Sequence, residues 1–235
     1  LNESWLGNKV IIMLEPRRVA ARMVAVQMAK LLGEEVGQSV GYQVKMESCY
    51  SKQTKLLVVT EAILVRKLQS DQALEDVSMV IFDEFHERSI HTDLSLALCL
   101  QVQELLRDDL KLLIMSATLD SNELTNLLGK IPVINSKGKI YDVENIYLET
   151  NIKQPDSKSI NTLLLQITLK AIKEDEGDIL VFLAGSREIQ KLQALLEESL
   201  KDKNIEILPL YSTLSKEKQD SLIKSYNSVY ANSSP

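Results

Sequence analysis

Met79-Val80-Ile81-Phe82-Asp83-Glu84-Phe85-His86 is the most informative segment of the chain, because two adjacent carboxylates directly follow an apolar run. NTPases commonly hold Mg²⁺ and the attacking water with an Asp-Glu pair placed in this way. Asp83 is therefore the candidate ligand of the ion, and Glu84 is the candidate base beside it. His86 adds a side chain that can sense the nucleotide. Taken alone, the pair also fits a solvated acidic turn before a helix.

Three more polar segments follow apolar runs in the same manner. They are Glu15-Pro16-Arg17-Arg18-Val19-Ala20-Ala21 after 10–14, Thr60-Glu61-Ala62 after 56–59, and Ser116-Ala117-Thr118 after 112–115. Open α/β sheets bind their ligands at the carboxyl ends of the strands. The sequence therefore predicts that all four segments meet at one edge of a sheet.

This set of motifs, in this order, resembles the DEAH/DExH branch of superfamily 2 helicases. Phe85, in the third place of its motif, makes the chain most similar to the bacterial HrpB-type helicases. The resemblance covers nearly the whole chain. It implies RecA-like parallel sheets of the P-loop NTPase type, flanked by helices. It also implies ATP and Mg²⁺ as cofactors and single-stranded nucleic acid, with RNA favoured, as the partner.

The resemblance also assigns roles to individual side chains. Asp83 and Glu84 would form the metal site, Glu84 would act as general base, and His86 would couple the nucleotide to a second domain. Ser116 and Thr118 would link the acidic site to the domain interface. The nucleic-acid contacts would be Arg17, Arg18, Thr60, Gly185 and Ser212. A solvated helix face remains the alternative for the arginines, which Arg22 extends into a cluster, and turn or capping chemistry for Ser116, Thr118 and Ser212.

Alternating strand and helix patterns predict a parallel sheet with helices on both faces. The expected domains are 1–135, a first RecA-like domain without its phosphate-binding loop, and 136–235, part of a second one. The predicted strands are 10–14, 41–44, 56–59, 77–82, 112–115, 140–148, 179–183 and 205–210. The predicted helices are 17–32, 60–68, 92 or 93 to 107, a short one from 120, one ending near 173, 186–200 and 215–226.

The sequence contains no Gly-x-x-x-x-Gly-Lys-Ser/Thr loop. The resemblance places that loop just ahead of a segment like 2–7, and places further motifs after the last residues. We therefore expect an internal fragment of a longer helicase that is nearly inactive alone, because no backbone cradle holds the phosphates. The competing hypothesis is a non-enzymatic helicase-like module that binds RNA or a partner. The intact Asp83-Glu84 pair favours the enzyme.

Length, composition and charge narrow the possible classes of protein. The chain has 235 residues, 45% of them hydrophobic and 26% charged, which is typical of a globular protein. It contains no apolar run of membrane-spanning length. The net charge of −6 argues against a generally basic binder, but it allows a local basic groove. Two histidines exclude a His-rich metal site, and two widely separated cysteines fit a reducing cytoplasm.

Overall fold

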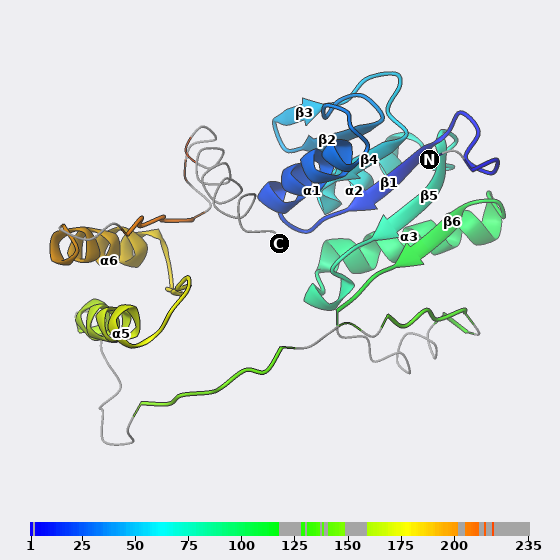
Figure 1. Cartoon of the computed structure of the whole chain (residues 1–235). Helices are drawn as coiled ribbons and strands as arrows, with labels where there is room; N and C mark the ends of the chain where they lie inside the picture. Colours follow the sequence, from blue (N-terminus) through cyan, green and yellow to red (C-terminus); the bar gives the residue numbers. More distant parts are fainter. Residues whose placement is uncertain are drawn as a thin grey trace. The chain divides into compact units, whose positions relative to one another are not determined.

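The computed structural model describes residues 1, 3–117, 128–129, 131–136, 138, 141–148, 159–201, 205–211, 214 and 218. The chain divides into two compact units, Leu1–Lys137 and Gly138–Pro235. In Figure 1 the first unit holds the labelled strands β1 to β6, and the second holds helices α5 and α6. No helix among these residues is both long and apolar enough to cross a membrane.

A six-stranded sheet forms the centre of the first unit, in the order β3-β2-β4-β1-β5-β6. Its strands are β1 Val10–Leu14, β2 Val40–Val44, β3 Glu47–Cys49, β4 Leu56–Val59, β5 Val77–Phe82 and β6 Lys111–Ile114. All neighbouring pairs are parallel except β2 and β3, which are antiparallel. The predicted α/β class with a mostly parallel sheet is therefore confirmed.

Helices cover both faces of this sheet, as Figure 1 shows. They are α1 Arg18–Leu31, α2 Glu61–Ser70 and α3 Ile90–Leu105. Successive strand residues point to opposite faces, so the two cores divide each strand between them. Ile12 and Leu14 of β1 join the core that α2 and α3 close. Ile11 and Met13 join the core that α1 closes with its small residues Ala21, Ala25 and Ala29.

The ends of the helices test the predicted capping and stop residues. Gly33 follows α1 with φ +71°, a conformation that favours glycine, and this confirms the predicted stop. The predicted start of α3 at Thr92 or Asp93 is wrong. The helix begins at Ile90, because the Ser89 hydroxyl accepts a hydrogen bond from the Thr92 amide at 3.0 Å and caps the first turn. Thr60 does precede α2, but its hydroxyl makes no capping hydrogen bond.

The short strand β3 was not predicted, because three residues carry too little pattern. It pairs back on β2 after a turn at Met46, whose φ is 65°. Gly41 permits this close return. A Cβ at position 41 would lie 2.6 Å from the Cβ of Tyr50 and 2.7 Å from the carbonyl oxygen of Cys49. Any side chain at position 41 would therefore push the β2–β3 hairpin apart.

The described residues of the second unit include two packed helices, α5 Ile160–Glu174 and α6 Ser186–Ser199. Their small core contains Leu192, Leu196 and Leu200, against which Val181 and Leu183 pack. The predicted strands 179–183 and 205–210 are wrong, since no strand is assigned there or in the described part of 140–148. A strand needs a hydrogen-bonded neighbour. The alternation of buried and exposed side chains expected of a strand is nevertheless present. Leu180 and Phe182 are 78% and 83% exposed, whereas Val181 and Leu183 face the core. The predicted helices from 120 and from 215 lie outside the described residues.

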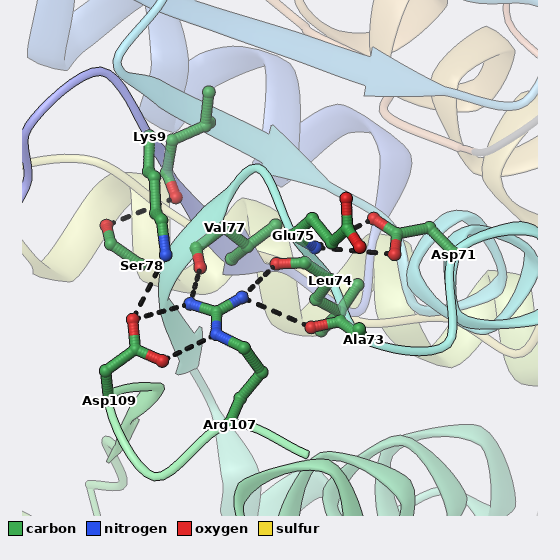
Figure 2. A network of polar contacts seen from close by, with 10 residues as sticks. Lys9, Asp71, Ala73, Leu74, Glu75, Val77, Ser78, Arg107 and Asp109 are labelled. Atoms are coloured by element: carbon green, nitrogen blue, oxygen red, sulfur yellow. Dashed lines mark hydrogen bonds and ion pairs between the residues drawn. The ribbon is translucent and has the colours of Figure 1, made fainter.

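The guanidinium of Arg107 links several backbone segments at the end of the sheet where β5 begins (Figure 2). Arg107, in the loop between α3 and β6, donates to the carbonyl oxygens of Ala73, Leu74 and Val77 at 3.2, 2.7 and 3.0 Å. Asp109 accepts two further bonds from Arg107 and one from Lys9. These cations hold the pKa of Asp109 well below its usual range. Leu74 is fully buried at φ 49°, so Arg107 ties down a strained turn.

We expect Arg107→Met to lower the free energy of unfolding of the first unit by about 2–3 kcal/mol, because three part-buried backbone carbonyls and Asp109 lose a charged donor. Trp5, the sole tryptophan, lies in this unit and reports its urea unfolding by fluorescence. Arg66→Met on the exposed surface of α2 is the control. An equal loss of unfolding free energy in the two variants would contradict the proposed stabilising role of Arg107.

Candidate active site

The acidic pair lies at the carboxyl end of the parallel sheet, as predicted. Leu14 of β1, Phe82 of β5 and Ile114 of β6 stand side by side in register. The next residues continue this row, since the Asp83 amide donates to the Leu14 carbonyl at 3.2 Å and the Met115 amide donates to the Phe82 carbonyl at 2.8 Å. Three segments distant in sequence therefore end at one place.

The loop that carries the pair is tightly wound. The Glu84 amide donates to Asp83 Oδ1 at 2.8 Å, and a single 3₁₀ turn, Phe85–Glu87, follows. Glu84 and Arg88 flank this turn with φ values of 50° and 43°, which are costly for residues other than glycine. Such strain persists only where the surroundings hold the backbone in place. The buried ring of Phe85, edge-on to Phe82 with centroids 6.4 Å apart, supplies part of that hold.

Glu84 and His86 lie together on the accessible side of the loop. His86 Nδ1 is 3.4 Å from Glu84 Oε2, and the two side chains are 30% and 45% exposed. Both can therefore reach a bound molecule without rearrangement of the core. This geometry places a carboxylate beside an imidazole, as the predicted pairing of a base with a neighbouring sensor requires.

Glu15 is an acidic residue of the site to which the sequence reading gave no role. It follows β1 directly, and it is only 3% exposed. Burial, a hydrogen bond with Asp83 and the negative charges of Asp83, Glu84 and Glu87 raise the pKa of Glu15 to about 7. The sequence signal that could have identified Glu15 is its position as a charged residue at the end of an apolar strand. Its burial beside Asp83 depends on the pairing of β1 with β5.

We expect the raised pKa of Glu15 to make the first unit lose stability as pH rises. The folded state binds the proton more tightly than the unfolded state, so this stabilisation is complete below the unfolded pKa of 4.5 and is lost as pH rises through about 7. Glu15→Gln mimics the protonated carboxyl. It should match the wild type near pH 4 and exceed its unfolding free energy by about 3 kcal/mol at pH 8.

Urea unfolding followed by Trp5 fluorescence measures this difference at each pH. The control is Glu104→Gln on the exposed surface of α3. Its difference from the wild type should stay constant with pH. A difference for Glu15→Gln that is equally flat would show that Glu15 ionises normally in the folded chain.

The donor set fits Mg²⁺ only in part. Mg²⁺ prefers oxygen ligands and is usually bound by one or two carboxylates together with substrate phosphates. Asp83 and Glu84 supply such carboxylates, and the raised pKa of Glu15 indicates that their surroundings favour added positive charge. Within the described ranges, no cluster of three or more acidic, His or Cys side chains could hold a metal without other ligands. The residues therefore suit an ion that arrives with a nucleotide.

The predicted nucleic-acid contacts of the first unit lie beside the acidic loop. Arg17 and Arg18 are exposed at the start of α1, and Arg17 Nη2 lies 2.8 Å from Glu87 Oε1. Thr60 stands before α2 with a hydroxyl that caps nothing. The grouping of Arg22 with these arginines is wrong, because Arg22 is only 8% exposed and belongs to the buried side of α1.

The remaining predicted residues fall on separate segments of the chain. Ser116 follows Met115, whose carbonyl oxygen accepts from the Phe85 amide at 3.0 Å, so its backbone adjoins the acidic loop. Gly185 precedes α6 in the second unit. Thr118 and Ser212 lie outside the described residues. Neither Ser116 nor Gly185 has a described contact that assigns it a role.

A parallel α/β sheet with an Asp-Glu pair at its carboxyl edge defines the RecA-like class of NTPase domain. Within that class, the chain belongs to the DEAD/DEAH box helicase family, whose model matches residues 2–127. The match contains the whole sheet, the acidic loop, and Arg17, Arg18 and Thr60.

Known proteins agree with this membership. The chain is 45% identical over 208 residues to the ATP-dependent RNA helicase HrpB of Escherichia coli, which covers 88% of the chain and 25% of that relative. It is 34% identical to the ATP-dependent RNA helicase HrpA of Borreliella burgdorferi, again over 88% of the chain and 25% of the relative. A crystal structure of the E. coli DEAH/RHA helicase HrpB superposes with a TM-score of 0.81 and 44% identity, covering 91% of the chain and 27% of that structure. The chain therefore spans about a quarter of the relatives it matches.

Proposed function

We propose that this chain is the part of an ATP-dependent RNA helicase that contains the acidic ATPase motif and part of the RNA-binding surface. One observation carries the proposal. Arg17, which starts the candidate nucleic-acid segment, forms an ion pair at 2.8 Å with Glu87 of the Asp83–Ser89 loop. The two functions that a helicase must couple therefore adjoin in this unit. Similarity to proteins named as ATP-dependent RNA helicases supports the choice of ATP and RNA.

In this proposal, Asp83 and Glu84 would hold Mg²⁺, which would supply charge neutralisation at the phosphates. Glu84 accepts the proton of the attacking water, for which its 45% exposed carboxylate is accessible. His86, 3.4 Å from Glu84, responds to the state of the nucleotide. The bond between Met115 and Phe85 brings the backbone of Ser116 beside the acidic loop, and Ser116 is proposed to link this loop to the domain interface. Thr118 is proposed to share that role.

Arg17 and Arg18 bind phosphates of single-stranded RNA, with Thr60 as a hydroxyl donor nearby. Such contacts position a strand without reading its sequence. The exposure of both arginines and the uncommitted hydroxyl of Thr60 support this assignment. Gly185 and Ser212 are proposed to contact the same backbone from the other domain.

We assign 1–135 to the first RecA-like domain and 136–235 to part of the second. The division of the chain into the units Leu1–Lys137 and Gly138–Pro235 supports a boundary close to this place. We also propose a cytoplasmic location. The two cysteines are unpaired, with Cys99 buried, and that usage suits a reducing compartment.

ATP binding tests the proposal. Because the 235 residues contain no Gly-Lys-Ser/Thr loop, this chain alone should bind Mg²⁺–ATP with a dissociation constant above about 1 mM, measured by calorimetry. A chimaera in which this chain replaces the matching part of E. coli HrpB should hydrolyse ATP, and RNA should accelerate the reaction. A folded chimaera without ATPase activity would favour a non-enzymatic RNA- or partner-binding module. Micromolar binding by the chain alone would contradict the role given to the missing loop.

A further inference from the structure

The carboxylate of Glu61 joins two helix starts. Glu61 is the first residue of α2, directly after Thr60. Its Oε2 accepts a hydrogen bond from Ser89 Oγ at 2.8 Å, and its Oε1 accepts one from Thr92 Oγ1. Ser89 and Thr92 are the cap and the third residue of α3. A single side chain therefore connects the segment after β4 to the exit of the Asp83–Ser89 loop.

Helix capping does not account for this arrangement. The cap of α3 is the bond from the Thr92 amide to Ser89 Oγ, which needs no carboxylate. An acidic residue in the first turn of α2 would stabilise that helix without any partner. Glu61 instead directs both oxygens across to α3. It does so at the end of a loop whose two left-handed residues, Glu84 and Arg88, need support from their surroundings.

We propose that Glu61 is a positioning residue that clamps the Asp83–Ser89 loop to the start of α2 and couples Thr60 to the acidic pair. The coupling half of this inference rests on the proposed RNA contact at Thr60. Glu61 itself touches neither the nucleotide nor the RNA. A shift at the start of α2 on RNA binding is transmitted through Ser89 and Thr92 to the backbone of the loop.

Hydrogen exchange on this chain tests the clamp without any ligand. The amides of Phe85, Glu87 and Arg88 are bonded within the loop or to Met115, so they report its opening. Glu61→Ala should accelerate their exchange about tenfold. The matched control is Glu34→Ala, which also removes a carboxylate with two bonds, both from Ser39 at 3.0 Å. It should leave exchange in the loop unchanged.

Thr92→Val keeps the shape of the side chain and removes both one of the two bonds to Glu61 and the 3.1 Å contact between the Thr92 and Ser89 hydroxyls. It should accelerate the same amides by less than Glu61→Ala does, and should add less in the Glu61→Ala background than in the wild type. Comparison of the two single variants with the double variant separates the clamp from general destabilisation. If the two substitutions only destabilised the fold, their effects on exchange would add in the double variant. Unchanged exchange in Glu61→Ala, or full additivity with Thr92→Val, would overturn the clamp.

A short fluorescein-labelled oligouridine tests the coupling. Its binding, followed by anisotropy, should slow exchange of the loop amides in the wild type. Glu61→Ala should bind it within about twofold of the wild type, since no phosphate contact is removed, but its loop exchange should no longer respond. A response that survives in Glu61→Ala overturns the coupling. No binding by the wild type overturns both the coupling and the proposed RNA surface, while the exchange of the free chain still decides the clamp.

Discussion

Glu84→Gln should lower ATP hydrolysis by about 10²-fold or more, the scale expected when a positioned general base is lost. The measurement needs a longer protein that joins this chain to a phosphate-binding loop, such as the chimaera with E. coli HrpB. Glutamine keeps the size and removes the base. Asp83 still has its carboxylate, so ATP binding should persist. RNA should also remain bound in the ATP state, because that state no longer decays.

The control for this result is Glu75→Gln, which makes the same chemical change in the turn before β5, at the opposite end of the sheet. Its steady-state rate with RNA should match that of the wild type. If the acidic pair were only a solvated turn, Glu84→Gln would alter stability by roughly 1 kcal/mol or less and leave turnover intact. Near-equal rates for the two variants would remove Glu84 from the mechanism.

Replacing Arg17 and Arg18 together with glutamate should weaken binding of single-stranded RNA by at least about tenfold, equally for all sequences. Each phosphate contact to a single strand contributes about −0.7 to the slope of log affinity against log salt, so the slope should become shallower by about 1.4. Anisotropy titrations of oligouridine and a mixed sequence, at several salt concentrations, measure both effects. The loss should be largest at low salt.

A matched pair of substitutions separates phosphate contact from net charge. Arg66→Glu with Lys67→Glu makes the same change of charge in the second half of α2, away from the acidic loop. This control should alter the affinity weakly and leave the salt slope close to that of the wild type. Equal effects from both pairs of substitutions, or an unchanged RNA affinity when Arg17 and Arg18 are replaced, would indicate that the two arginines only form a solvated helix face. The ion pair of Arg17 with Glu87 would then be structural only.

Much of the first unit could be predicted because its elements are local patterns. Among the described residues, five of its six strands and its three helices were expected close to their observed positions, and the acidic pair lies at the predicted edge of the sheet. The missed strand β3 has only three residues. The start of α3 was misplaced because the capping role of Ser89 was not recognised, although a serine before a helical pattern is a usual start signal.

The second unit shows the limit of that approach. Residues 179–183 have the alternation of a strand, with Val181 and Leu183 turned to the core and Leu180 and Phe182 outward. Alternation determines which side chains are buried, but a sheet forms only where a neighbouring backbone completes the hydrogen bonds. No such neighbour lies beside 179–183 among the residues that the structure describes, so the pattern is present without the strand.

The class of the sheet, the faces of its strands and the acidic pair at its edge were predictable, because they follow from residue order along single segments. The partners of Glu15, Arg17 and Glu61 depend instead on long-range packing, since these residues bond to the loop after β5 from segments far away in the chain. The order β4-β1-β5 brings those segments together. Burial and the field of neighbouring carboxylates, rather than residue type, then set the ionisation of Glu15.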